Sequence, residues 1–276
     1  MEKICCDLTV AGINLRIFSD RELPFQDCLK DFYNPFDKAD IIYNTVTVNN
    51  PDDFVPSGAK QVYSGSGMTV FELGGQTYHR YFYGGELSVV NIGEKKTIYI
   101  SADESRPLNI QKSLALETEI LNFDGIFMHA SLIKTGNKGI IFSAPSGIGK
   151  STQASLWAKH RGARIINGDR AAVRFVNGKW LAYGSPWAGS SGIYLNESTE
   201  LSAIVFLGQA SQNTVKRLSG ARAFSAMMRG GIFPYWSKAK MDVACGISER
   251  LLSEVPVFEF NCTPDKSAVE ELEKFI

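Results

Sequence analysis

The chain has 276 residues, of which 44% are hydrophobic, so one large domain or two smaller ones with a sizeable core are expected. Its 29 basic and 29 acidic residues balance, which gives no electrostatic case for nucleic acid or an anionic membrane as partner. No apolar run reaches the length of a membrane span, and the N-terminus lacks the hydrophobic segment of a signal peptide. Five cysteines at irregular spacing indicate neither a disulfide framework nor a zinc site, so a cytoplasmic protein is expected.

Residues 1–105 have the composition of a β-rich region of unknown role. A hairpin around Gly12 is expected over residues 8–18, and further strands are expected over residues 41–48, 69–73, 77–83, 87–92 and 97–100. Short strands at this spacing predict an antiparallel meander. His79 lies in an aromatic strand and is expected to be a packed or edge residue rather than a ligand, and Cys5 and Cys6 are expected to be buried by strand packing rather than to carry redox chemistry. This half contains no catalytic constellation.

Ser105-Arg106-Pro107 marks the joint between this region and the rest of the chain, residues 106–276. Proline suits the first turn of a helix, and a helix is expected from Pro107 to about Phe123. An apolar strand over residues 125–134 follows, with His129 inside it, and a short turn leads to a second apolar strand at residues 140–142. The two strands are expected to form a hairpin, which brings His129 back beside the second strand.

A glycine-rich loop follows that second strand and opens into a helix at Lys150. Strand, glycine loop and Gly-Lys-Ser at a helix start are the context of a phosphate-binding loop. Glycines let backbone N–H groups turn toward phosphate oxygens, and the helix N-terminus adds donors and a positive dipole end. Lys150 supplies a charge for the outer phosphates and Ser151 a hydroxyl ligand for Mg²⁺. The residues expected to bind nucleotide phosphates are Ser146, Gly147, Ile148, Gly149, Lys150, Ser151 and Thr152. One departure from the pattern is Ala144, where the first glycine is usual.

A short buried strand after the loop helix ends in Asp169. NTPases place a second metal-organising carboxylate at such a strand end, although Asn-Gly-Asp is also good turn composition. A hairpin over residues 171–183 and a loop of small residues, 184–192, come next; the loop either closes over substrate or is a plain connection. Strands are expected at 201–207, 214–218 and 255–260, and helices at 221–228, 238–252 and from Thr263-Pro264 onward.

Three features together resemble the HPr kinase/phosphorylase family and its relatives with the phosphoenolpyruvate-carboxykinase type of fold. They are His129-Ala130-Ser131, 21 residues before Lys150, the loop 146–151, and Asp169-Arg170, 19 residues after Lys150. The resemblance spans residues 125–195 and implies an α/β (α+β) P-loop kinase core over residues 106–276, preceded by the β-rich region. It does not cover residues 1–105, so HPr itself is not implied as substrate.

The resemblance also implies roles for single residues. Asp169 would accept the proton of a seryl hydroxyl, Lys150 would bind ATP phosphates, and Ser151 and Asp169 would hold Mg²⁺. His129 would lie against the catalytic carboxylate or the transferred phosphoryl group. Relatives of this kind are often oligomers, so the resemblance is compatible with a homo-oligomer.

Two positions depart from the family. The family usually has two acids before the arginine, whereas this chain has Gly168 before Asp169. The family's later acidic metal ligand should fall at residues 187–189, where no acid stands; Asn196 and Glu197 are the nearest substitutes. The missing acids put phosphorylase activity in doubt.

Three hypotheses follow from the sequence. The first is an ATP- and Mg²⁺-dependent kinase acting on a hydroxyl, a serine of a protein or peptide. The second is a nucleotide-binding regulator or scaffold with little catalysis, motivated by Gly168. The third is a kinase of a small molecule such as free serine, which a closed pocket under the 184–192 loop would favour over an open groove.

Overall fold

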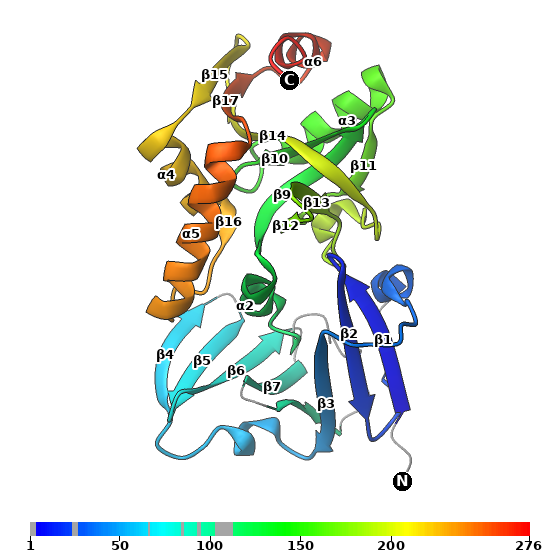
Figure 1. Cartoon of the computed structure of the whole chain (residues 1–276), viewed down its shortest axis with the longest axis vertical. Helices are drawn as coiled ribbons and strands as arrows, with labels where there is room; N and C mark the ends of the chain where they lie inside the picture. The colour runs from blue at the N-terminus through cyan, green and yellow to red at the C-terminus, as the bar shows by residue number, and fades with distance from the viewer. Residues whose placement is uncertain (1–3, 24–26, 66, 84–85, 93–94, 103–112) are drawn as a thin grey trace. The chain divides into compact units, whose positions relative to one another are not determined.

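The structure, a computed structural model, describes residues 4–23, 27–65, 67–83, 86–92, 95–102 and 113–276. The chain divides into two compact units, Met1–Leu116 and Glu117–Ile276. The division expected near residue 105 falls outside the described residues. Each unit is built around its own large sheet, so the chain is a mixed α/β protein (Figure 1). No helix within the described part of the chain is both long and apolar enough to cross a membrane.

An eight-stranded sheet forms the first unit, with strand order β1-β2-β3-β8-β7-β6-β5-β4. Two short 3₁₀ helices, η1 and η2, accompany it. The elements are β1 Ile4–Val10, β2 Ile13–Ser19, η1 Asp27–Phe32, β3 Ile41–Val48, η2 Pro51–Phe54, β4 Lys60–Gly65, β5 Met68–Leu73, β6 Gln76–Tyr83, β7 Glu86–Ile92 and β8 Lys96–Ser101.

The meander expected in this unit is confirmed for β5 to β8, which pair antiparallel in chain order. Two features differ from the expectation. Strand β3 pairs parallel with both β2 and β8, and β4 was not predicted. A parallel neighbour requires a crossover connection, which local periodicity does not reveal. The sequence of β4 lacks the alternation of apolar and polar residues that identifies a half-buried strand.

The helix expected over residues 107–123 is not continuous. Residues 103–112 lie outside the described part, and after them α2 covers only Leu116–Glu119 and η3 covers Ile120–Phe123. Ala115 has φ 48°, in the left-handed region, which interrupts a helix just before α2. Asp124, with φ 51°, ends η3 in the same conformation. The apolar residues of this segment therefore lie in short helical turns instead of one continuous helix.

A nine-stranded sheet with helices forms the second unit. Its elements are β9 Gly125–Thr135, β10 Lys138–Ser143, α3 Lys150–Arg161, β11 Arg164–Asn167, β12 Arg170–Val176, β13 Lys179–Tyr183, η4 Gly189–Ser191, β14 Ser198–Gln209, β15 Thr214–Leu218, α4 Gly220–Gly230, β16 Gly231–Ile232, α5 Lys238–Glu254, β17 Val257–Cys262 and α6 Lys266–Leu272. Strand β14 pairs parallel with β10 and β17, and β10 also pairs with β9. The pairings β10-β9-β12-β13-β14-β10 close a ring of five strands.

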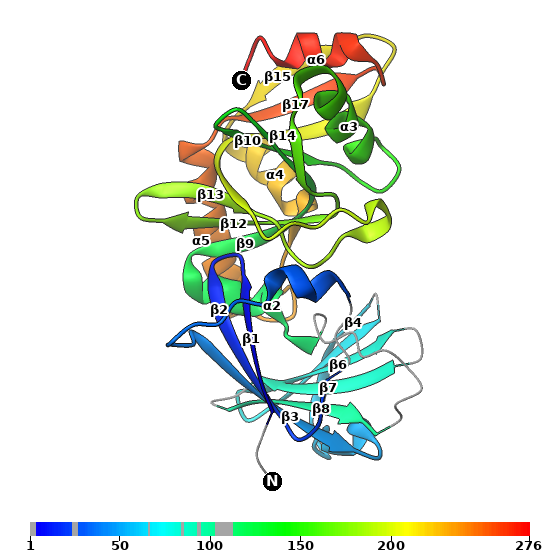
Figure 2. The same cartoon turned by 90° about the vertical axis from the view of Figure 1, so that its right-hand side faces the viewer.

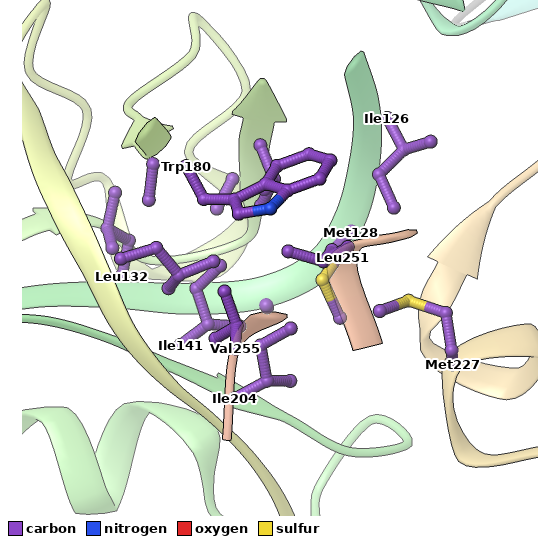
Figure 3. Packing of buried hydrophobic residues seen from close by; sticks show 14 of the residues in the cluster. Ile126, Met128, Leu132, Ile141, Trp180, Ile204, Met227, Leu251 and Val255 are labelled. Carbon is purple, nitrogen blue, oxygen red and sulfur yellow. The ribbon is translucent and has the colours of Figure 1, made fainter. Parts of the chain in front are cut away.

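Helices bury both faces of this sheet. One hydrophobic cluster joins the strands to α4 and α5, and Figure 3 shows its residues. The residues labelled there are Ile126, Met128, Leu132, Ile141, Trp180, Ile204, Met227, Leu251 and Val255. A second cluster joins the opposite face to α3 and α6, where Trp157 packs with Phe142 and Val269 (Figure 2 shows these helices). Successive residues of β10 point to opposite clusters, as the period of a strand requires.

Three local expectations have clear outcomes. His79 is confirmed as a packed residue, fully buried in β6. Cys5, near the start of edge strand β1, is exposed rather than buried, and Cys6 is half-buried. The final helix begins at Lys266 and not at Thr263-Pro264, because Asp265 caps it by accepting a hydrogen bond from the Ser267 N–H at 2.8 Å.

Candidate functional site

The glycine loop between β10 and α3 has the conformation that its sequence predicts. Gly147 and Gly149 have φ of 82° and 123°, which side-chain-bearing residues rarely adopt, and Gly149 directly precedes the helix. Ala144 replaces the usual first glycine because its methyl group is buried in the cluster with Phe142 and Trp157. The loop therefore keeps its two essential glycines and anchors its first residue in the core.

The remaining residues of the predicted phosphate site surround the helix start. Ser146, Ser151 and Thr152 are exposed, and Ile148 is half-buried against the second core cluster. The backbone N–H groups of the first helical turn have no partner within the helix and can donate to an anion. The predicted phosphate-binding residues other than Lys150 are thus exposed or half-buried around the N-terminus of α3.

Lys150 lies under this surface and is only 8% exposed. Its Nζ donates to the carbonyl oxygen of Ala144 at 2.9 Å and lies 3.0 Å from Nε2 of His129. An ammonium group has no lone pair, so Nε2 of His129 is the acceptor in this contact. Burial lowers the pKa of Lys150, and the negative charge of Asp169 partly opposes that shift.

Asp169 lies on the other side of the same imidazole. Nδ1 of His129 is 3.3 Å from Oδ1 of Asp169, so one ring bridges the lysine and the carboxylate. The hydrogen bond from His129 lowers the pKa of Asp169 below its ordinary value, although burial acts in the opposite direction. A lowered pKa means that Asp169 is ionised at neutral pH and can accept a proton.

The predicted hairpin and the return of the chain at β12 place these groups. His129 lies on β9 and pairs across the sheet with Arg170, the first residue of β12. The N–H of Ala130 donates to the carbonyl oxygen of Asp169 at 2.8 Å, and the Ser143 hydroxyl donates to the carbonyl oxygen of His129 at 3.0 Å. Backbone pairing between β9 and the start of β12 therefore places His129 next to Asp169 and Arg170.

Asn167 is a site residue that the sequence analysis missed. It is fully buried, and its Oδ1 accepts from the backbone N–H groups of Asp169 and Arg170 at 2.9 and 2.7 Å. Its Nδ2 donates to the carbonyl oxygens of Ser185 and Trp187 at 2.8 and 3.2 Å. One amide thus fixes the turn carrying Asp169 and ties it to the 184–192 loop. Its only sequence signal was the Asn-Gly-Asp composition, which looked like an ordinary turn.

The 184–192 loop packs directly on this turn. A Cβ on Gly189 would lie 2.8 Å from Cγ of Asp169, so the loop backbone lies on the carboxylate. A side chain at Gly168 would collide with the side chain of Ser191, which explains the missing acid at position 168. The Arg170 guanidinium lies 5.5 Å from the ring centre of Trp187 and 3.6 Å from Oδ2 of Asp169.

Among the described residues, no group of three or more His, Cys, Asp or Glu side chains gathers where a metal ion would bind. Glu197, one of the two substitutes for the missing acid, has its carboxylate bonded to Arg164. Asn196, the other, is exposed. The metal-binding role predicted for Asp169 and Ser151 stays a prediction.

Comparison with known proteins yields no family, and the likeness to solved structures is distant. No family model matches the chain, and no curated protein is similar to it in sequence. Among solved structures, the chain resembles the Hpr(Ser) kinase/phosphatase from Coxiella burnetii, with a TM-score of 0.32 and 10% sequence identity over 54% of this chain and 90% of that one. So distant a likeness carries no argument about activity, which has to come from the site residues.

Proposed function

We propose that the protein is an ATP- and Mg²⁺-dependent kinase that transfers the γ-phosphoryl group to a hydroxyl, a serine of a protein or peptide. The observation that carries the proposal is the imidazole of His129 lying between Nζ of Lys150 and the Asp169 carboxylate, at 3.0 and 3.3 Å. Phosphoryl transfer needs a cation for the phosphates and a base for the acceptor hydroxyl, held close together. Lys150 and Asp169 meet both needs at the end of a phosphate-type loop.

The ammonium group of Lys150 has three N–H donors, and the Ala144 carbonyl and His129 engage two of them, so one donor is left for a phosphate oxygen. Its hydrogen bond to the Ala144 carbonyl holds Nζ at the start of the loop. Nδ1 of His129, 3.3 Å from Oδ1 of Asp169, orients the carboxylate. Asp169 then takes the proton of the acceptor hydroxyl as the new phosphorus–oxygen bond forms.

The Ser151 hydroxyl and the Asp169 carboxylate suit a magnesium ion that binds together with the nucleotide. Mg²⁺ is commonly held by one or two protein oxygen ligands together with substrate phosphates, and it keeps several waters. The Ser151 hydroxyl and the Asp169 carboxylate would be its protein ligands. The ion would neutralise charge on the β- and γ-phosphate oxygens. With no second acid at position 168, we expect weak metal binding in the absence of nucleotide.

The test is phosphoryl transfer to a panel of acceptors, namely seryl peptides, a denatured protein and free serine, with wild type and Asp169→Asn. The proposal predicts product from at least one hydroxyl acceptor with wild type, and a loss of about 100-fold or more with Asp169→Asn because the base is removed. Transfer to free serine with none to peptides would favour the small-molecule kinase instead. Equal rates for the two proteins would contradict the role of Asp169.

A nucleotide-binding regulator is the second candidate, and one observation favours it. The side chain of Ser191 fills the space that an acid at position 168 would need, and Glu197 is engaged by Arg164. A site that binds ATP but transfers to no acceptor on the panel would support this candidate.

A further inference from the structure

The short helix η4, Gly189–Ser191, lies against the carboxylate that we propose as catalytic base. A Cβ on Gly189 would be within 2.9 Å of Cβ, Cγ and Oδ1 of Asp169, a separation that only a glycine backbone permits. Gly189 itself has φ 55°, a second reason for glycine at this position. The turn therefore occupies space beside Asp169 that an acceptor segment would have to enter.

Ser191 also lies in this turn, and its side chain packs against Gly168, the residue before Asp169. Its Cβ is 2.6 Å from the position that a Cβ on Gly168 would take, so the lack of a side chain at 168 is what admits it. The hydroxyl donates to the carbonyl oxygen of Ala188 at 2.6 Å and accepts from the N–H of Ile193 at 3.2 Å. Rotation about the Cα–Cβ bond gives it two further staggered positions around the same Cβ.

We propose that Ser191 is a phosphorylation site of this protein, modified in cis by its own Lys150–Asp169 centre. The inference rests on the proposed function, and it identifies the first acceptor as a seryl hydroxyl of the turn that packs on the base through Gly189. In the step, the bond from the γ-phosphorus to the bridging oxygen of a nucleoside triphosphate breaks and a phosphorus–Oγ bond to Ser191 forms. The hydroxyl proton passes to Asp169, and nucleoside diphosphate leaves.

The modification would change the site in a definite way. A phosphoserine carries nearly two negative charges at neutral pH. Next to the ionised Asp169 it would be repelled, while Arg170, whose side chain is 39% exposed, offers a cation within the same turn. We expect phosphorylated η4 to leave the carboxylate and to open the position beside Asp169 to another acceptor. Self-phosphorylation would then precede transfer to a substrate.

The experiment incubates the purified full-length protein with Mg²⁺ and radiolabelled ATP in the absence of any acceptor. The expected result is a mass gain of one phosphoryl group, located at Ser191 by peptide mapping. The rate constant should be independent of protein concentration because the reaction is intramolecular. Ser191→Ala should remove the label, whereas Ser191→Thr should retain part of it.

Two matched controls separate the inference from general labelling. Ser190→Ala changes the exposed neighbouring hydroxyl, and Ser211→Ala changes an exposed serine in the turn between β14 and β15. Both variants should label like wild type. Label that persists in Ser191→Ala, or a rate that rises with protein concentration, would overturn the inference.

The same samples distinguish failure of the inference from failure of the proposed function. If ATP is bound and consumed with a hydroxyl acceptor but the protein stays unlabelled, only the assignment of Ser191 is wrong. If wild type neither binds ATP nor transfers phosphate to any acceptor, the proposed function fails and the inference falls with it.

Discussion

The two units each contain a histidine within a strand, and the two histidines have opposite surroundings. His79 in β6 is fully buried, and its Nδ1 lies 3.4 Å from the Tyr81 hydroxyl. His129 in β9 has a side chain 39% exposed and contacts Lys150 and Asp169. The strand alone does not set this difference. What matters is that a glycine loop and a returning strand bring two charged groups to His129.

The largest expected effects come from replacing each histidine with alanine, which tests the comparison directly. We expect His129→Ala to lower phosphoryl transfer about 100-fold, because Asp169 loses its orienting partner, while the free energy of unfolding barely changes. We expect His79→Ala to leave transfer unchanged and to lower the free energy of unfolding by about 1–3 kcal/mol, because a buried side chain is lost. Steady-state transfer assays and urea denaturation measure both quantities. The reverse pattern, with activity depending on His79, would break the comparison.

Asn167→Ala sharpens the account of how Asp169 is held. It leaves two buried backbone N–H groups and two carbonyl oxygens without their partner, which should lower the free energy of unfolding by about 1–3 kcal/mol. If Asn167 positions Asp169, kcat should fall more than KM rises, because the phosphate site at α3 is untouched.

Asn196→Ala is the matched control for this variant, since Asn196 is exposed and lies after the 184–192 loop. It should behave like wild type in both assays. A destabilised Asn167→Ala protein with wild-type kcat would assign Asn167 a structural role alone.

The smallest effect concerns the buried charge of Lys150. Its folded-state pKa lies below the ordinary value of 10.5, so the unfolded chain binds more protons and stability rises with pH through that range. Burying the ammonium therefore costs stability at neutral pH. Lys150→Met should raise the free energy of unfolding by about 0.5–2 kcal/mol at pH 7, and the gain should shrink as the pH approaches 10.5. Denaturation at several pH values measures this; a large loss of stability at pH 7 would mean that Lys150 is structural.

Local sequence patterns were sufficient for the parts of the site that are contiguous in the chain. The strand at 140–142, the loop ending at Gly149 and the helix from Lys150 were predicted and are β10 and α3. The hairpin that returns His129 was also predictable, because a short turn between two apolar strands forces antiparallel pairing.

Features set by long-range packing were not predictable from the sequence. In the sequence, Asn167 has the composition of a turn residue. Its structural role was not predictable because its hydrogen-bond partners lie up to 20 residues away in the chain. Gly168 looked like a lost acid, whereas in the structure its missing side chain makes room for Ser191. The parallel position of β3 depends on strands far along the chain, and the break at Ala115 depends on a single backbone angle.

The most direct test of the account is calorimetric titration of ATP and Mg²⁺ into wild type, Lys150→Ala and Lys159→Ala. Lys159 is an exposed lysine on the same helix and serves as the matched control. We expect wild type and Lys159→Ala to bind with similar affinity and Lys150→Ala to lose binding. No binding by wild type, or equal binding by Lys150→Ala, would contradict the claim that the loop and Lys150 form a working phosphate site.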